Sequence, residues 1–121
     1  MGDYRELDAW ANARKLAVAV YKQTAKFPVV ERFGLIGQMR RAAISVASNI
    51  AEAHGRGPSG DRVQFLLMAR GSMFELQTQA LISGDLGYIP AEHAEAMVKA
   101  SVIIGKQLSS LIRHYRTQSP P

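Results

Sequence analysis

The sequence contains no cysteine, which excludes disulfide scaffolds, thiolate metal sites and cysteine nucleophiles together. It also lacks a long apolar run: the uncharged stretches 42–51 and 76–84 are about half of the ~20 residues that a membrane helix needs. The N-terminus turns acidic and polar at once and shows no signal-peptide pattern. We therefore expect a cytoplasmic protein with no membrane association.

The 121 residues suit a single domain, 1–121, with 47% apolar and 21% charged residues. Fifteen Lys and Arg residues against ten Asp and Glu residues give a formal net charge of +5. Such an excess favours a polyanionic partner such as RNA or DNA. Five charges spread over a surface also suit a protein that binds neither.

Glycine and proline gather in clusters that divide the chain into four long segments. Phe27-Pro28 closes the first segment, and glycine-rich stretches at 55–60 and 84–90 separate the others. No segment shows the sustained alternation of a strand. We expect an all-α, antiparallel up-down-up-down four-helix bundle with helices at about 7–26, 32–54, 59–84 and 91–117.

Apolar periodicity indicates which faces point inward. The second segment repeats through Ile36, Met39, Ala43, Val46, Ile50 and Ala53, and the fourth through Ala94, Met97, Val98, Ser101, Ile104, Gly105, Leu108, Leu111, Ile112 and Tyr115. In the second segment Ile44, Ala47 and Ala51 add another apolar flank. A surface helix of a monomer needs one apolar face, so the second flank favours a homo-oligomer; a thick monomeric core is the alternative.

Motifs for metal or cofactor chemistry are missing. His54, His93 and His114 have neither the Glu-x-x-His spacing of di-iron bundles nor the His-x-x-x-His spacing of zinc sites. No nucleophile elbow marks a Ser, His and acid grouping. We therefore expect no enzyme activity, no metal and no cofactor, and a hydrolytic enzyme is a distant alternative.

The loop 55–60 matches the pattern G-x-G-x-x-G, but a helix precedes it where the dinucleotide fingerprint requires a strand. The loop is better explained as a helix end followed by a new start. Gly55 is expected to stop the second helix in a left-handed conformation, and Ser59 or Asp61 to cap the third.

A buried polar network is predicted in the third segment. Arg70 and Gln77 fall within the stripe formed by Val63, Leu66, Phe74 and Leu81, so both should point inward. A buried guanidinium needs an acidic partner, because an unpaired charge away from water is costly. The predicted network comprises Arg14, Glu52, Arg70, Glu75 and Gln77, with Glu52 as the first choice for Arg70. A catalytic role for Arg70 with Glu52 is the less favoured reading.

Basic side chains form two stripes. Lys15, Lys22 and Lys26 lie close in angle on the first helix, and Lys99, Lys106 and Arg113 extend over about 21 Å of the fourth. If these helices are neighbours, the stripes can share a face that follows phosphates, helped by Arg40 or Arg56. The alternative is that these side chains only face water, since no aromatic residue is interleaved with them for base stacking.

The second helix also carries a recognisable signature. Gln38-Met39-Arg40-Arg41-Ala42-Ala43-Ile44-Ser45, followed by Ser48-Asn49-Ile50-Ala51-Glu52, resembles the Q-x-R-R-A-x-x-S-x-x-x-N-I-A-E pattern of proteins encoded in intervening sequences of bacterial 23S ribosomal RNA genes. Leu7-Asp8-Ala9-Trp10, Phe27-Pro28, Gly71-Ser72, Glu75-Leu76-Gln77-Thr78-Gln79 and Leu86-Gly87-Tyr88-Ile89 look like family positions in the same order.

This resemblance implies a homopentamer of four-helix bundles, in a family often labelled ribosomal and without an established enzyme activity. Similar proteins include the accessory protein of diversity-generating retroelements, which works with a reverse transcriptase and binds nucleic acid through a basic surface. We therefore expect a non-enzymatic, oligomeric nucleic-acid-binding or scaffolding protein, with a partner protein as a further possibility. A pure assembly module is the alternative.

Overall fold

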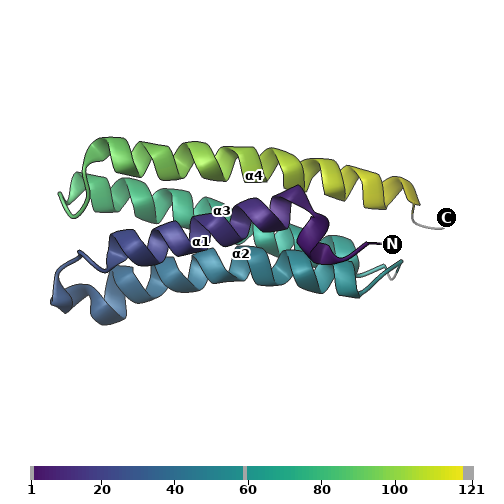
Figure 1. Cartoon of the computed structure of the whole chain (residues 1–121), viewed down its shortest axis with the longest axis horizontal. Helices are drawn as coiled ribbons and strands as arrows, with labels where there is room; N and C mark the ends of the chain where they lie inside the picture. The colour runs from purple at the N-terminus through teal and green to yellow at the C-terminus, as the bar shows by residue number, and fades with distance from the viewer. Residues whose placement is uncertain (1, 59, 119–121) are drawn as a thin grey trace.

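The computed structural model describes residues 2–58 and 60–118. Four long helices make up most of this part: α1 (Asp8–Thr24), α2 (Gly37–Gly55), α3 (Arg62–Asp85) and α4 (Ala91–Gln118). Figure 1 shows successive helices running in opposite directions, with both ends of the chain at the same end of the bundle. The expected all-α four-helix bundle is confirmed, and the described ranges contain no strand.

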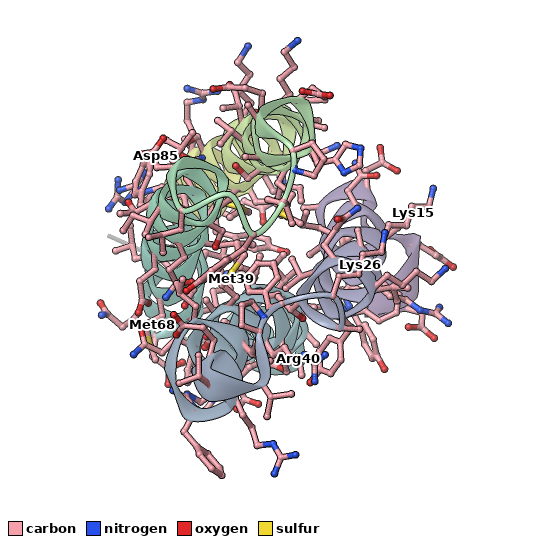
Figure 2. All side chains as sticks on the ribbon, turned by 90° about the vertical axis from the view of Figure 1, so that its left-hand side faces the viewer. Lys15, Lys26, Met39, Arg40, Met68 and Asp85 are labelled. Atoms are coloured by element: carbon pink, nitrogen blue, oxygen red, sulfur yellow. The ribbon has the colours of Figure 1, made fainter. Side chains whose placement is uncertain are left out.

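The core lies along the bundle axis and receives side chains from all four helices. Figure 2, a view down the axis, shows Met39 of α2 pointing into the centre and Lys15 of α1 pointing out of the bundle. The inward positions expected for the second and fourth segments are correct, except that Ile36, Val98, Gly105 and Leu111 stay partly exposed.

The inward face expected for α3 is wrong. Of the expected stripe only Leu66 is buried, whereas the Phe74 and Leu81 side chains are 58% and 42% exposed. Alternating intervals of four and three residues separate seven of the eight buried positions, which is the heptad spacing of helices that cross at shallow angles. These seven are Arg62, Leu66, Ala69, Met73, Leu76, Ala80 and Ser83, and Gln79 beside Ala80 is the eighth.

A buried arginine ties the start of α3 to the end of α4. Arg62 is only 5% exposed, and its guanidinium carbon lies 3.9 Å from the centroid of the Tyr115 ring. The same guanidinium donates to the Gly57 carbonyl at 2.9 Å and to Gln118 Oε1 at 3.4 Å. The ring face and the two oxygens replace water around the buried cation.

The connection between α1 and α2 is held by a glutamate. The helix expected from residue 32 begins as α-helix only at Gly37, because a short 3-10 helix (Val29–Glu31) and an irregular turn (Arg32–Ile36) precede it. Glu31 Oε1 accepts from the Leu35 N–H at 3.3 Å, and Oε2 accepts from the Tyr88 hydroxyl at 2.8 Å. The two connections at this end of the bundle are thereby joined.

The connection between α2 and α3 differs from the expectation by two residues. The Arg56 N–H still bonds to the Glu52 carbonyl at 3.1 Å, so the helical turn continues past Gly55. Gly57 takes the left-handed conformation instead, with φ of 59°, which favours a residue without a Cβ. Asp61 precedes α3 but makes no side-chain cap, and Ser59 lies outside the described residues.

The Arg62 contacts predict a difference between two arginines of the same helix. Arg62→Ala should lower the free energy of unfolding by about 2 kcal/mol, because it removes a desolvated cation–ring contact and charge-assisted hydrogen bonds. Arg70→Ala, the matched control at a half-exposed position, should change it by less than about 0.5 kcal/mol. Urea unfolding followed by circular dichroism measures both. Equal losses would contradict this orientation of α3.

The Tyr88–Glu31 hydrogen bond predicts a pH dependence. The bond is the main cause that raises the pKa of the Tyr88 hydroxyl above its ordinary value of 10.0, with burial and the Glu31 charge adding to it. The stabilisation should therefore be complete below pH 10.0 and disappear as the pH rises through the elevated pKa. Thermal unfolding should show the native protein more stable than Tyr88→Phe at neutral pH, with the gap closing in alkali. A gap that does not change with pH would refute the bond.

Candidate functional site

Basic side chains on α4 lie on its outer side, as the sequence indicates. Lys99, Lys106 and Arg113 are all exposed, while Ile104 and Leu108 between them are buried. Their seven-residue spacing keeps them on one side of the helix. This stripe is therefore accessible in the folded chain.

The stripes on α1 and α4 do not converge on one groove. The helices are neighbours, since Asn12 Nδ2 donates to Gln107 Oε1 at 3.2 Å. Lys15, however, lines the groove between α1 and α4, whereas Lys106 and Arg113 line the groove between α3 and α4. Lys22 is exposed on α1, and Lys26 is exposed in the turn after it, because α1 ends at Thr24, two residues before the expected end at residue 26. The outer crest of α4 separates the two sets of charges.

The groove between α3 and α4 gathers four basic side chains. Two adjoining hollows of about 400 and 330 Å³ share Arg70, Ser109 and Arg113 as lining residues. Among the described residues, no Asp or Glu lines either hollow. We name this surface the α3/α4 basic groove, and its basic residues are Arg70, Lys106, Arg113 and Arg116.

An aromatic ring lies in the same groove. Phe74 of α3 is more than half exposed and lines the hollow with Gln77, Ser109 and Ser110. Guanidinium and ammonium groups bind phosphate, hydroxyl and amide groups donate hydrogen bonds, and an exposed ring stacks on a base. The expectation that no aromatic residue accompanies the basic side chains fails here, because Phe74 comes from the neighbouring helix.

The predicted buried polar network is not formed. Arg14, Glu52 and Glu75 are exposed, and Arg70 and Gln77 are half-buried at the edge of the basic groove. Glu52 lies 3.0 Å from Arg56 in an ion pair, in place of the expected pair with Arg70. The cause is the rotation of α3 about its axis, which directs Arg70 toward α4.

The Arg14 guanidinium lies 5.7 Å from the centroid of the Trp10 ring at the surface.

Arg40 has partners within the chain. Its Nε donates to Thr24 Oγ1 at 2.9 Å and its Nη2 to the Tyr21 carbonyl at 3.3 Å, with the Tyr21 ring 4.5 Å below. Arg40 thus binds the C-terminal turn of α1 to α2. A structural contribution accounts for this side chain.

Arg56 is engaged in a similar way. It pairs with Glu52 at 3.0 Å and with Asp61 at 3.3 Å, and its guanidinium lies 4.7 Å from the centroid of the Phe65 ring. These contacts join the end of α2 to the start of α3. The exposed pairs add little stability individually, but they fix the turn.

Residues of the second-helix signature converge on a polar hollow between α2 and α3. Ser45 Oγ and Ser72 Oγ lie 2.9 Å apart, and Asn49 Nδ2 donates to Ser45 Oγ at 2.9 Å. Gln38, Arg41 and Glu75 complete the lining of a hollow of about 360 Å³. The small serines let the two helices approach closely, so this part of the signature specifies helix packing.

Metal ligands are not grouped in the described ranges 2–58 and 60–118: no cluster of three or more His, Cys, Asp or Glu side chains occurs there. In the same ranges no helix has the length and apolar character needed to cross a membrane.

A comparison with protein families identifies the family of this chain. Residues 5–110 match the model of the 23S rRNA-intervening sequence proteins. The chain belongs to this family. The match covers all of α1, α2 and α3 and most of α4, and it confirms the resemblance noted in the second helix.

A solved structure supports the same architecture. It is a protein of unknown function from the S23 ribosomal protein family of Bacteroides thetaiotaomicron, 24% identical in sequence, with a TM-score of 0.76. The alignment covers 86% of this chain and 97% of that one. At this level of identity the likeness concerns the fold. Comparison with curated proteins gives no match.

Proposed function

We propose that this family member is a cytoplasmic, non-enzymatic protein that binds nucleic acid through the α3/α4 basic groove. The supporting observation is the groove itself: four basic side chains from two helices surround hollows that no Asp or Glu lines. A polyanion entering it meets attraction along the whole groove. The stripe residue Lys99 lies further along the outside of α4 and extends the positive surface.

The chemistry of the groove favours unpaired nucleotides over a duplex. Phosphate contacts carry no sequence information, so the four basic side chains position a strand without selecting it. The exposed ring of Phe74 adds a stacking surface for a base, an interaction that tolerates all four bases. We therefore propose binding of single-stranded RNA or DNA with weak sequence preference.

A homo-oligomer is part of the proposal. Ile44 on the outside of α2 is 46% exposed, and Ala47 and Ala51 beside it are partly exposed. This apolar flank supports an interface between copies, and the family resemblance favours five subunits. A ring would repeat the basic groove, and repeated weak sites raise the overall affinity.

The alternative, an assembly module that binds no nucleic acid, is favoured by a different observation. Val29, Val30 and Phe33 are almost fully exposed at the connection between α1 and α2. Exposed apolar residues clustered in one connection are typical of protein contacts.

Titration of a labelled single-stranded oligonucleotide at two salt concentrations tests the proposed groove. Native affinity should fall steeply with salt, with a slope of log Kd against log salt of about 3 for four phosphate contacts per subunit. Changing Lys106, Arg113 and Arg116 together to Gln should weaken binding at least about tenfold and flatten this slope. Fluorescence anisotropy measures both quantities.

The control changes Lys15, Lys22 and Lys26 to Gln, which removes the same charge from α1 and the turn that follows it. It should weaken binding less than about threefold, because it reduces only the long-range electrostatic attraction of the protein for the oligonucleotide. Equal losses of affinity in the two variants would contradict binding in the α3/α4 basic groove. An absence of binding at low salt would leave the assembly module as the better account.

Light scattering tests the oligomer. The native protein should have several times the mass of the 13.3 kDa chain, and Ile44→Glu should reduce the mass to that of one chain while helical circular dichroism is retained. Ile44 is the better position than Ala47, because Ala47 also packs against the core. A native protein that is monomeric at micromolar concentrations would refute this part.

A further inference from the structure

A second groove, between α1 and α4, is apolar and open along its side. Its volume is about 430 Å³, and it shares no lining residue with the α3/α4 basic groove. Ile103 in its wall is 56% exposed. The lining residues used below are Lys15, Ala19, Gln23, Ala96, Ala100 and Ile103.

Small side chains leave this groove unfilled. Ala19 on α1 and Ala96 and Ala100 on α4 line it, and none of them reaches across to the other helix. The Asn12–Gln107 hydrogen bond lies at one end of the groove, and Gln23 lies toward the other. From Asn12 to Gln23 the groove extends over about 17 Å, or three turns of a helix.

The α1 side of this groove is positively charged. Lys15 lines the groove, Lys22 follows it at position i+7 on the same side of α1, and Lys26 lies in the turn after α1. Figure 2 shows Lys15 at the outer side of the bundle. Two carboxylates, Glu92 and Glu95, lie in the first turns of α4.

An unpaired hydrogen-bond acceptor also lies in this groove. Gln23 Oε1 is buried and has no hydrogen-bond partner among residues 2–58 and 60–118. Buried polar atoms of folded proteins are nearly always paired. Because this oxygen is buried, a donor of a bound partner would reach it only after the Gln23 side chain turned toward the groove.

We propose that the α1/α4 groove binds an amphipathic helix of a partner protein, with a narrow apolar stripe and acidic residues on the flank that faces α1. Alanines on both walls let a third helix approach at the usual interaxial distance of ~8–10 Å. An i, i+3, i+4, i+7 stripe matches the three-turn length, and the acidic flank faces the lysines of α1 and not the carboxylates of α4.

Other occupants fit less well. The exposed apolar flank of α2 in a second copy has Arg41 one turn before Ile44, so it brings a basic and not an acidic side chain to the lysines. A small apolar ligand would stay largely in water in a groove whose wall residue Ile103 is more than half exposed, whereas ligand sites enclose most of their ligand. A partner helix fits both the open length of the groove and the positive charge of its α1 side.

The probe is a fluorescein-labelled helical peptide of about five turns with a leucine stripe, glutamates on the flank that faces α1 and a serine placed for Gln23. The comparison peptide has lysine in place of every glutamate. The glutamate peptide should bind at least tenfold more tightly by anisotropy. Ala100→Trp, which fills the groove, should weaken its binding at least tenfold, while Gln64→Trp on the exposed side of α3 should leave it unchanged.

Lys15→Glu keeps the groove open and should reduce the ratio of the affinities of the two peptides by at least threefold. Equal binding of the peptides, no binding of either, or unchanged binding by Ala100→Trp would overturn the proposal. A fall in the mass measured by light scattering for Ala100→Trp would also overturn the proposal, because it assigns the groove to a second copy. Tighter binding of a labelled fatty acid than of the peptide would overturn it as well. Nucleic-acid titration of Ala100→Trp separates this result from the proposed function, because the basic groove is intact in that variant.

Discussion

The rotation of α3 about its own axis is the constraint on which the surface of this bundle depends. Seven buried positions at alternating intervals of four and three, from Arg62 to Ser83, face the other helices. Arg62 fixes this orientation at the start of the helix, since its guanidinium lies against Tyr115 and bonds to the Gly57 carbonyl. With those positions inside, Arg70 and Phe74 emerge beside α4. A rotation of α3 by one residue position would turn the Arg70 and Phe74 side chains into the core and remove the basic groove.

Charged side chains at the ends of the bundle join its connections, whereas those along its sides line grooves. At the ends, Glu31 joins two connections through Tyr88, Arg40 holds the last turn of α1, and Arg56 fixes the turn between α2 and α3. Along the sides, basic residues line the α3/α4 basic groove and lie at the α1 edge of the α1/α4 groove. The bundle therefore uses its net positive charge both for structure and for a surface that attracts anions.

The sequence allowed the fold to be predicted because α1, α2 and α4 each have a clear inward apolar side, with a further apolar flank on α2, and because glycine or proline lies near their ends. Its failure in α3 has a physical cause: Phe74, Leu81, Met68 and Ile82 make that helix apolar nearly all round, so apolar positions alone do not determine its rotation. The strict four-three spacing through Ala69, Met73 and Ala80 was the available signal. The basic groove depends on that rotation and on contact between two helices, so neither Arg70 nor Phe74 was assigned to it in advance. The open α1/α4 groove was equally hidden, because it arises from alanines that face each other across helices distant in sequence.

A thiol footprint tests the central claim, that a polyanion binds between α3 and α4, most directly. The chain has no cysteine, so single cysteines can be introduced without background: Ser109→Cys in the basic groove, Ala19→Cys in the α1/α4 groove and Ser48→Cys on the exposed side of α2. The rate of thiol labelling is measured at low salt with and without a single-stranded oligonucleotide. The account predicts slower labelling at position 109 and unchanged labelling at positions 19 and 48. Unchanged labelling at position 109, or protection at position 19 in its place, would contradict it.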